Sequence, residues 1–222
     1  MLLGTAALFG QSSFVRGEEL FVNDKPGEAL AFLEAAVAEN PANIRASLYL
    51  GIVYQQLNML DEAIVVYRHV LPRAGKDTAL IAYNLGNAYY TRGIISSAEE
   101  FYTKALDADP VHAPSYLNRA NVRLKQGALR DAISDYELYL SLAPLSPKRP
   151  RIEQLLASIR AEFAAAERRR IMEEARAAEE AGRKQRLLED VAASLQSAAE
   201  ETRGLSTGSE DIQGYESEFE LE

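Results

Sequence analysis

The chain has 222 residues, of which 47 % are hydrophobic and 26 % charged, and its formal net charge is −9. This length allows one or two domains, and a composition rich in Ala, Leu and Glu favours helix. The lack of cysteine excludes disulfides, thiolate metal sites and cysteine nucleophiles. No segment has the positive excess that nucleic-acid binding requires, so we expect no nucleic-acid partner.

The first ten residues, MLLGTAALFG, are apolar and rich in small side chains. They are too few for a transmembrane helix, which takes roughly 20 residues. They are similar to the hydrophobic part of a secretory signal without its basic leading part, which would favour a periplasmic or exported protein. The alternative is an N-terminal helical cap, which would fit a cytoplasmic protein. No later apolar run is long enough for a stable membrane span.

Residues 11–144 contain an internal repeat with a period of about 34 residues. Three series of positions recur at this period: Gly17, Gly51, Gly86 and Ala120; Ala29, Ala63, Ala98 and Ala132; and Leu33, Tyr67, Tyr102 and Tyr136. We place the repeat boundaries at about 11–42, 43–77, 78–111 and 112–145. The second repeat is one residue longer than its neighbours at its end, within residues 72–77.

Each repeat is predicted to contain two helices. In the third repeat, apolar residues at helical spacing precede and follow Gly93, which breaks the pattern. Gly127 takes this place in the fourth repeat, Asn58 in the second and Asp24 in the first. Three repeats end at a proline, which cannot continue the helical pattern into the next repeat.

These residues resemble a known family. The segment 83–89, YNLGNAY, followed by Gly93, Ala98, Tyr102 and Pro110, is similar to a near-consensus tetratricopeptide repeat. The other three repeats match less fully, the first least. The resemblance implies an all-α fold, a right-handed α-solenoid of about four helical hairpins. Small residues would let paired helices approach closely, and stacking would bury the apolar face that one hairpin leaves open.

A capping helix and a long helix are predicted after the repeats. Residues 146–166 contain one apolar stripe, which we interpret as a helix covering the fourth hairpin. Residues 167–203 form a charged, Ala-rich segment with two short apolar seams on either side of Gly182, where a kink is expected. This segment is interpreted either as a solvated single helix or as a coiled coil or partner-docking helix.

Residues 204–222 contain six acidic and no basic residues. Their low hydrophobicity and uniform charge predict disorder. Tyr215, Phe219 and Leu221 interrupt the acidic residues, so a docking motif is the alternative to a solubilising tail.

The resemblance also implies where a partner would bind, because the first helix of each hairpin lines the concave side of such a stack. Asn84 and Asn118 recur one period apart, as do Asn87 and Asn121. An amide side chain both donates and accepts hydrogen bonds, so it can pair with an extended peptide backbone. Asparagine could equally be a common soluble repeat residue. The candidate groove residues are Arg45, Tyr49, Gln56, Tyr83, Asn84, Asn87, Tyr90, Asn118, Asn121 and Lys125.

The function predicted from sequence is that of a scaffold or adaptor that binds an extended peptide segment of a partner protein. The alternative is a structural or self-assembling protein that forms a homodimer through its C-terminal helix. We expect neither an enzyme nor a cofactor or metal site, because His69 and His112 are isolated in the sequence and no phosphate-binding loop or nucleophile motif is present.

Overall fold

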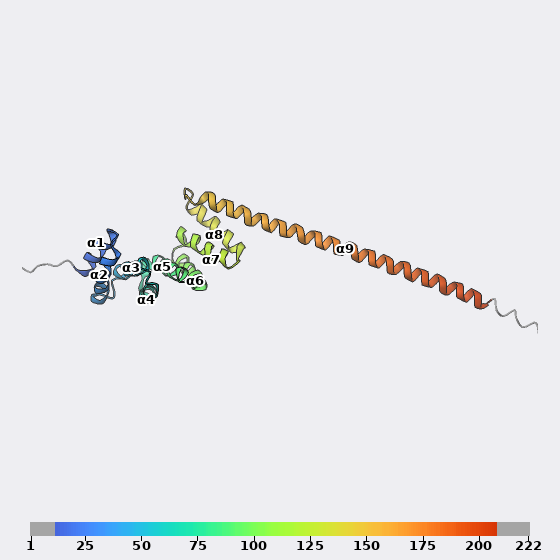
Figure 1. Ribbon diagram of the computed structural model, residues 1–222, viewed down its shortest axis with the longest axis horizontal. Coiled ribbons are helices and arrows are strands. Elements are labelled where there is room, and N and C mark those ends of the chain that lie inside the picture. Colours follow the sequence, from blue (N-terminus) through green and yellow to red (C-terminus); the bar gives the residue numbers. More distant parts are fainter. Residues whose placement is uncertain (1–11, 208–222) are drawn as a thin grey trace, which may run out of the picture. The chain divides into compact units, whose positions relative to one another are not determined.

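The computed structural model describes residues 12–207 (Figure 1). Within these residues it contains nine α-helices and two short 3-10 helices. The chain divides into two units, residues 1–156 and 157–222. The expected signal segment or cap at residues 1–10 lies outside the described residues, as does most of the expected acidic tail.

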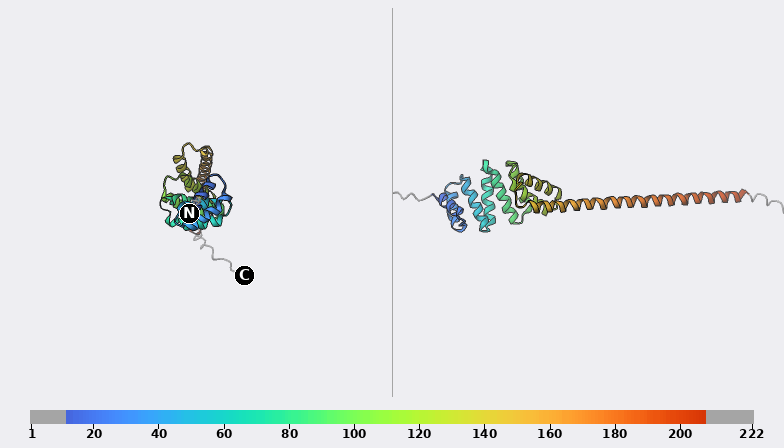
Figure 2. Two further views of the ribbon diagram at one scale, coloured as in Figure 1. Left: turned by 90° about the vertical axis from the view of Figure 1, so that its left-hand side faces the viewer. Right: turned by 90° about the horizontal axis from the view of Figure 1, so that it is seen from above.

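Four helical hairpins fill the described part of the first unit, in agreement with the predicted fold. Successive hairpins pack on one another through α2 and α3, α4 and α5, and α6 and α7 (Figure 2). The helix pairs are α1 (Ser13–Val22) with α2 (Pro26–Glu39), α3 (Ile44–Gln56) with α4 (Leu60–Val70), α5 (Thr78–Thr91) with α6 (Ile95–Ala108), and α7 (Ala113–Lys125) with α8 (Leu129–Leu142). The extra residue of the second repeat lies among two 3-10 turns, η1 (Leu71–Arg73) and η2 (Gly75–Asp77).

The periodic residues form the core of this unit. All four alanines of the second series are fully buried. The bulky series is also buried, and Tyr67 and Tyr102 lie against the glycine of the preceding helix. A Cβ atom on Gly86 would lie 2.7 Å from the Tyr102 ring, so glycine at this position permits the close helix approach that the period predicts.

The turn inside each hairpin is made by a residue in the left-handed backbone region. Asp24, Asn58, Gly93 and Gly127 have φ angles of 55°, 61°, 83° and 77°. These are the four positions at which the sequence predicted a helix break. Glycine, asparagine and aspartate adopt this conformation at low cost, which explains why they occupy it.

A single helix, α9 (Arg149–Thr207), follows the fourth hairpin. Ile152 and Leu156 at its start are buried against Tyr136, Tyr139 and Leu140 of α8, as expected of a capping helix. The helix begins at Arg149, directly after the turn through Pro147. Proline within the first turn of a helix is tolerated, so Pro150 does not delay the start further.

The predicted end of this helix at residue 203 is corrected to Thr207. The helix also runs through Gly182 without interruption, although we expected a kink there. One glycine costs a helix only about 1 kcal/mol, which its helix-forming neighbours offset. No helix in the described part of the chain is long and apolar enough to cross a membrane.

Candidate functional site

Amide side chains on α5 and α7 form a hydrogen-bonded network with tyrosines of the second helices. The hydroxyl of Tyr102 donates to Oδ1 of Asn87 at 2.8 Å, and Nδ2 of Asn118 donates to the same oxygen at 2.8 Å. One hairpin later, the Tyr136 hydroxyl donates to Oδ1 of Asn121 at 2.7 Å. Burial raises the pKa of Tyr102 and of Tyr136, so both hydroxyls stay protonated and remain donors.

This network fixes which groups are left for a ligand. Oδ1 of Asn87 already accepts from Tyr102 and from Asn118, so Asn87 offers a ligand its amide N–H groups. Oδ1 of Asn121 accepts one hydrogen bond, from Tyr136, and keeps a second lone pair for a ligand. In Asn118 the nitrogen is engaged, by Asn87 and by the Tyr83 hydroxyl at 3.4 Å, which leaves its Oδ1 as an acceptor. The three amides together therefore present both donors and acceptors to a ligand.

A cavity of about 270 Å³, here called the α5–α7 cavity, lies beside these amides. It is lined by Asn87, Tyr90, Thr91, Tyr102, Asn118 and Asn121. The ammonium group of Lys125 lies 5.0 Å from the centroid of the Tyr90 ring, within cation–π range. Four of the ten candidate residues, Asn87, Tyr90, Asn118 and Asn121, therefore line one cavity, and Lys125 lies beside the ring of Tyr90.

Asn84 and Tyr83 are candidate groove residues on α5 that lie outside this cavity lining. Nδ2 of Asn84 donates to the Leu80 carbonyl of its own helix at 2.8 Å. It does not line the α5–α7 cavity, and Asn118 is bonded to Asn87 and not to its periodic equivalent. The ring of Tyr83 packs against His112, with centroids 5.0 Å apart. The Tyr83 hydroxyl also accepts from Nδ2 of Asn118 at 3.4 Å and so helps to hold that amide in place.

The remaining candidates lie on the first two hairpins. Arg45 forms an ion pair with Glu18, donates to the Tyr49 hydroxyl at 3.1 Å and lies over the Phe14 and Tyr49 rings. Gln56 is exposed at the end of α3. These three residues lie on α3, and none of them lines the α5–α7 cavity.

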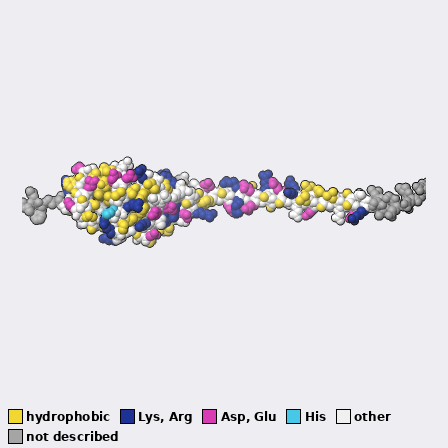
Figure 3. Space-filling view, turned by 90° about the horizontal axis from the view of Figure 1, so that it is seen from below, with side chains coloured by type: hydrophobic (Ala, Val, Ile, Leu, Met, Phe, Trp, Pro, Cys, Tyr) yellow, Lys and Arg dark blue, Asp and Glu magenta, His cyan; other side chains and the backbone are white. Residues whose placement is uncertain are grey.

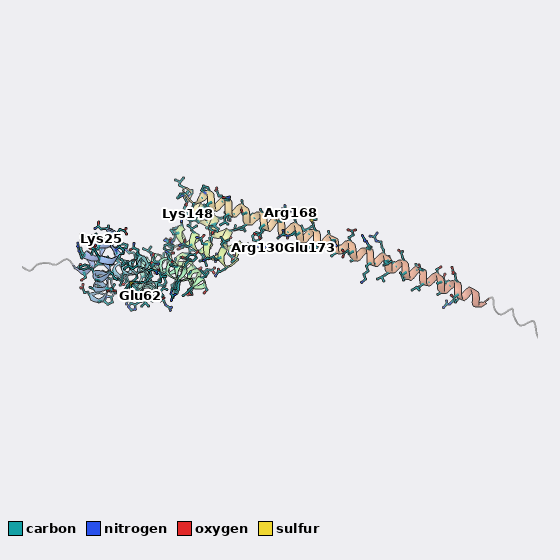
Figure 4. The ribbon with its side chains drawn as sticks, in the orientation of Figure 1. Lys25, Glu62, Arg130, Lys148, Arg168 and Glu173 are labelled. Atoms are coloured by element: carbon teal, nitrogen blue, oxygen red, sulfur yellow. The ribbon has the colours of Figure 1, made fainter. Side chains whose placement is uncertain are left out.

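A second concavity, here called the α7–α9 cavity, was not anticipated from the sequence. It has a volume of about 500 Å³ and is lined by Leu117, Asn121, Leu124, Tyr136, Lys148, Arg151, Ile152 and Leu155. We sought groove residues only on the first helices of the repeats, so the contribution of α9 was missed. Lys148, the residue directly before α9, is labelled in Figure 4.

A buried ionic network between the third and fourth hairpins was also missed. Asp135 of α8, only 1 % exposed, accepts two hydrogen bonds from Arg119 and one from Arg123, at 2.8–2.9 Å. Arg123 also pairs with Glu99 and Arg119 with Thr103, both on α6. Burial opposes the charged form of Arg119, but its bonds to Asp135 and that negative charge raise its pKa above the usual value. This network joins the two hairpins and faces neither cavity.

Comparison with known proteins assigns the family. Models described as tetratricopeptide repeat match residues 20–83, 73–113 and 83–147, together more than half of the chain. The chain belongs to the tetratricopeptide repeat family. The described residues hold no cluster of side chains suited to a metal ion. Tetratricopeptide repeats generally act as protein–protein interaction modules and are usually non-catalytic.

Curated relatives match the chain over part of its length. The chain is 32 % identical to protein O-mannosyl-transferase tmtc2 of Xenopus laevis over 34 % of its own length and 9 % of the relative. It is 30 % identical to a TPR repeat-containing protein of Methanocaldococcus jannaschii, over 38 % of the chain and 28 % of the relative. Identity to human DnaJ homolog subfamily C member 7 is 42 %, over 22 % of the chain and 10 % of the relative. The chain therefore spans less than a third of each of these relatives.

Solved structures share the tetratricopeptide fold. PilF of Pseudomonas aeruginosa superposes with a TM-score of 0.62 at 16 % identity, over 69 % of this chain and 70 % of that one. MamA from Desulfovibrio magneticus superposes with a TM-score of 0.56 at 20 % identity, over 61 % and 76 %. At these identities the likeness shows the fold alone.

Proposed function

We propose that this chain is an adaptor that binds an extended peptide segment of a partner protein on the inner faces of α5 and α7. The observation that carries the proposal is the α5–α7 cavity, in which fixed amides converge with the Tyr90 ring. The Asn118 oxygen accepts from a backbone N–H of the ligand, while the Asn87 and Asn121 nitrogens donate to its carbonyls. Such contacts place little demand on peptide sequence.

Preorganisation supports this proposal. The amides are held by buried tyrosine hydroxyls and by one another, so they lose little freedom when a peptide binds. The Tyr90 ring adds apolar area at low entropic cost. Arg45, Tyr49 and Gln56 extend the proposed contact surface toward the first hairpins, as a longer peptide would require.

Replacing Asn118 by alanine tests the proposal. Peptides would be selected from a displayed random library on the full chain, and their affinities measured by fluorescence anisotropy. We expect Asn118→Ala to weaken binding by about threefold to tenfold, the worth of one or two hydrogen bonds. Asn87 keeps its bond from Tyr102 in this variant, so the fold should be preserved.

Asn84→Ala is the matched control, because Asn84 is the periodic equivalent of Asn118 but bonds its own helix. We expect its affinity to stay within about twofold of the parent, which is less than one hydrogen bond is worth. Selected peptides that bind both variants as tightly as the parent would contradict the proposed site.

A second candidate function is self-association through α9, and the distribution of its side chains favours it. Between residues 167 and 183, ion pairs one turn apart support the helix: Glu167–Arg170, Arg170–Glu174, Arg176–Glu180 and Glu179–Arg183. Beyond them Leu187, Leu188, Val191 and Leu195 are 48–67 % exposed. Figure 3 shows this hydrophobic region following the charged part of the helix. A second copy of the helix could bury these apolar side chains by packing against them as a short coiled coil.

The double variant Leu188→Glu/Leu195→Glu tests self-association by light scattering after size-exclusion chromatography. We expect the parent chain to form a dimer and the variant a monomer, because charges would enter the apolar seam. Gln196→Glu adds a charge to the same helix outside the seam and should remain dimeric. A parent chain that is monomeric at all accessible concentrations would refute this function.

A further inference from the structure

The α7–α9 cavity has the walls of a side-chain pocket. Leu117, Tyr136 and Ile152 are buried at 8 %, 2 % and 5 % exposure, and the half-buried Leu124 and Leu155 complete an apolar surface. Its volume of about 500 Å³ exceeds what one leucine or phenylalanine side chain needs. Small-ligand sites in proteins have similar volumes and similar apolar linings with a few polar groups.

This pocket is continuous with the proposed peptide path. Asn121 lines both the α5–α7 cavity and the α7–α9 cavity. Leu117, Asn121 and Leu124 lie on one face of α7, since residues four and three apart share a helix face. A peptide held by the amides can therefore place a following side chain between α7 and α9.

Unpaired cations border this path. Lys148 and Arg151 are exposed, and neither has an ion-pair partner among the described residues. The neighbouring Arg149 is different, because it pairs with Glu153 and donates to the carbonyls of Leu140 and Pro144. Lys125, over the Tyr90 ring, adds a third cation without a carboxylate partner in the described part of the chain.

Acidic residues are missing from both linings. Neither cavity is lined by Asp or Glu, although the chain carries 33 acidic residues and a net charge of −9. A positive apolar surface on an acidic protein attracts carboxylates selectively, because the rest of the surface repels them. The charges therefore indicate an acidic ligand.

We infer that the α7–α9 cavity binds one large apolar side chain of an acidic peptide segment of a partner protein, with Lys148 and Arg151 pairing with carboxylates on either side of it. This inference rests on the proposed peptide-binding function and adds a specificity to it. Apolar burial supplies the anchor, and the cations select peptides with Glu or Asp next to the anchor residue.

Three labelled peptides test the inference by fluorescence anisotropy with the full chain at low salt. The first is Ser-Asn-Ala-Ser-Glu-Phe-Glu-Ser, the second has both Glu replaced by Gln, and the third has Phe replaced by Ser. We expect the second and third peptides to bind the parent at least tenfold more weakly than the first. We also expect the affinity of the first to fall as salt is added.

Charge reversal on the protein gives the matching test. The double variant Lys148→Glu/Arg151→Glu should bind the first peptide at least tenfold more weakly than the parent chain does. Its affinity for the Gln peptide should stay within twofold of the parent's. The control variant Arg168→Glu/Arg169→Glu changes the net charge by the same amount, on an exposed part of α9. Its affinity for both peptides should equal that of the parent chain. If both double variants lost the same affinity for the first peptide, the effect would come from long-range charge alone. That result would overturn the inference that the cavity binds an acidic peptide.

The outcomes separate this inference from the function on which it rests. If the Glu and Gln peptides bind with equal affinity and Asn118→Ala weakens the binding of both, the inferred preference for acidic peptides is refuted. The proposed peptide-binding function is then retained. If Asn118→Ala weakens neither these nor library-selected peptides, the proposed function itself fails. Tighter binding of the first peptide after deletion of residues 208–222 would assign the pocket to the chain's own acidic end and overturn a partner as its ligand.

Discussion

Replacing Asp135 by alanine is expected to lower the free energy of unfolding by about 3–5 kcal/mol, the usual cost of leaving buried charges without their partner. Asp135 is 1 % exposed and receives three hydrogen bonds from Arg119 and Arg123. These arginine side chains are only 13 % and 20 % exposed. Without the carboxylate, Arg119 would lose its charged partner and Arg123 would keep only its pair with Glu99, and water could compensate only in part at this buried junction of the third and fourth hairpins.

Urea unfolding followed by circular dichroism measures this loss, with Asp131→Ala as the control. Asp131 is an exposed aspartate in the first turn of the same helix, α8. Its removal should cost less than about 1 kcal/mol, the value of a favourable charge near a helix N-terminus. A similar small loss for both variants would show that Asp135 is not the centre of the junction.

The location of this network explains why the loss should be large. Most of the core of the first three hairpins and that of the fourth hairpin with α9 form two separate apolar clusters. Arg119, Arg123 and Asp135 lie where the fourth hairpin meets α6. In a stacked repeat protein, stability depends on each interface between neighbours, so a weakened junction uncouples the last hairpin from the rest.

The repeat pattern made the core and the turns predictable from sequence. At every helix crossing the same steric demand recurs, so Ala63, Ala98 and Ala132 had to be small and are fully buried. The turns follow the same logic, because each requires one residue with positive φ. Both demands are local and act on one side chain at a time.

The hydrogen-bond partners of the site were less predictable. The period relates Asn118 to Asn84, yet Asn118 bonds Asn87. Which of two amides on α5 meets α7 depends on the offset between successive hairpins, and the repeat length does not define that offset. The Asn84 side chain bonds a carbonyl of its own helix instead of a neighbouring helix. Such alternatives have similar energies, so the sequence does not indicate which one forms.

Asp135 had a sequence signal that the period obscured. It lies three residues after Ala132 and beside Tyr136, on the inward face of α8. An acid inside an apolar stripe, together with Arg119 and Arg123 one turn apart on the preceding helix, indicates a buried ion pair. The Lys148 and Arg151 pair had no comparable signal, because the period ends before α9.

Replacing Gly51 by alanine is expected to destabilise the protein by roughly 1–3 kcal/mol, the range for overpacking a close-packed core. The added Cβ would lie 2.3 Å from Cε1 and 2.4 Å from Cζ of Tyr67, which is fully buried. The ring would have to move, and its hydroxyl would lose the 2.8 Å hydrogen bond to Gln55. Alanine gains about 1 kcal/mol of helix propensity over glycine, which is too little to offset this.

Gly182→Ala is the matched control, since Gly182 also lies inside a helix but a Cβ there would meet only the Arg186 guanidinium, at 3.9 Å. With no clash, the propensity term alone remains, so α9 should become more helical by circular dichroism and the first unit should unfold as before. Gly86→Ala should fall between the two, because its Cβ would approach the Tyr102 ring only to 2.7 Å. The opposite order, with Gly51→Ala the mildest, would mean that the tyrosine rings yield easily. Close glycine–ring contact would then not be what sets the spacing of α3 and α4.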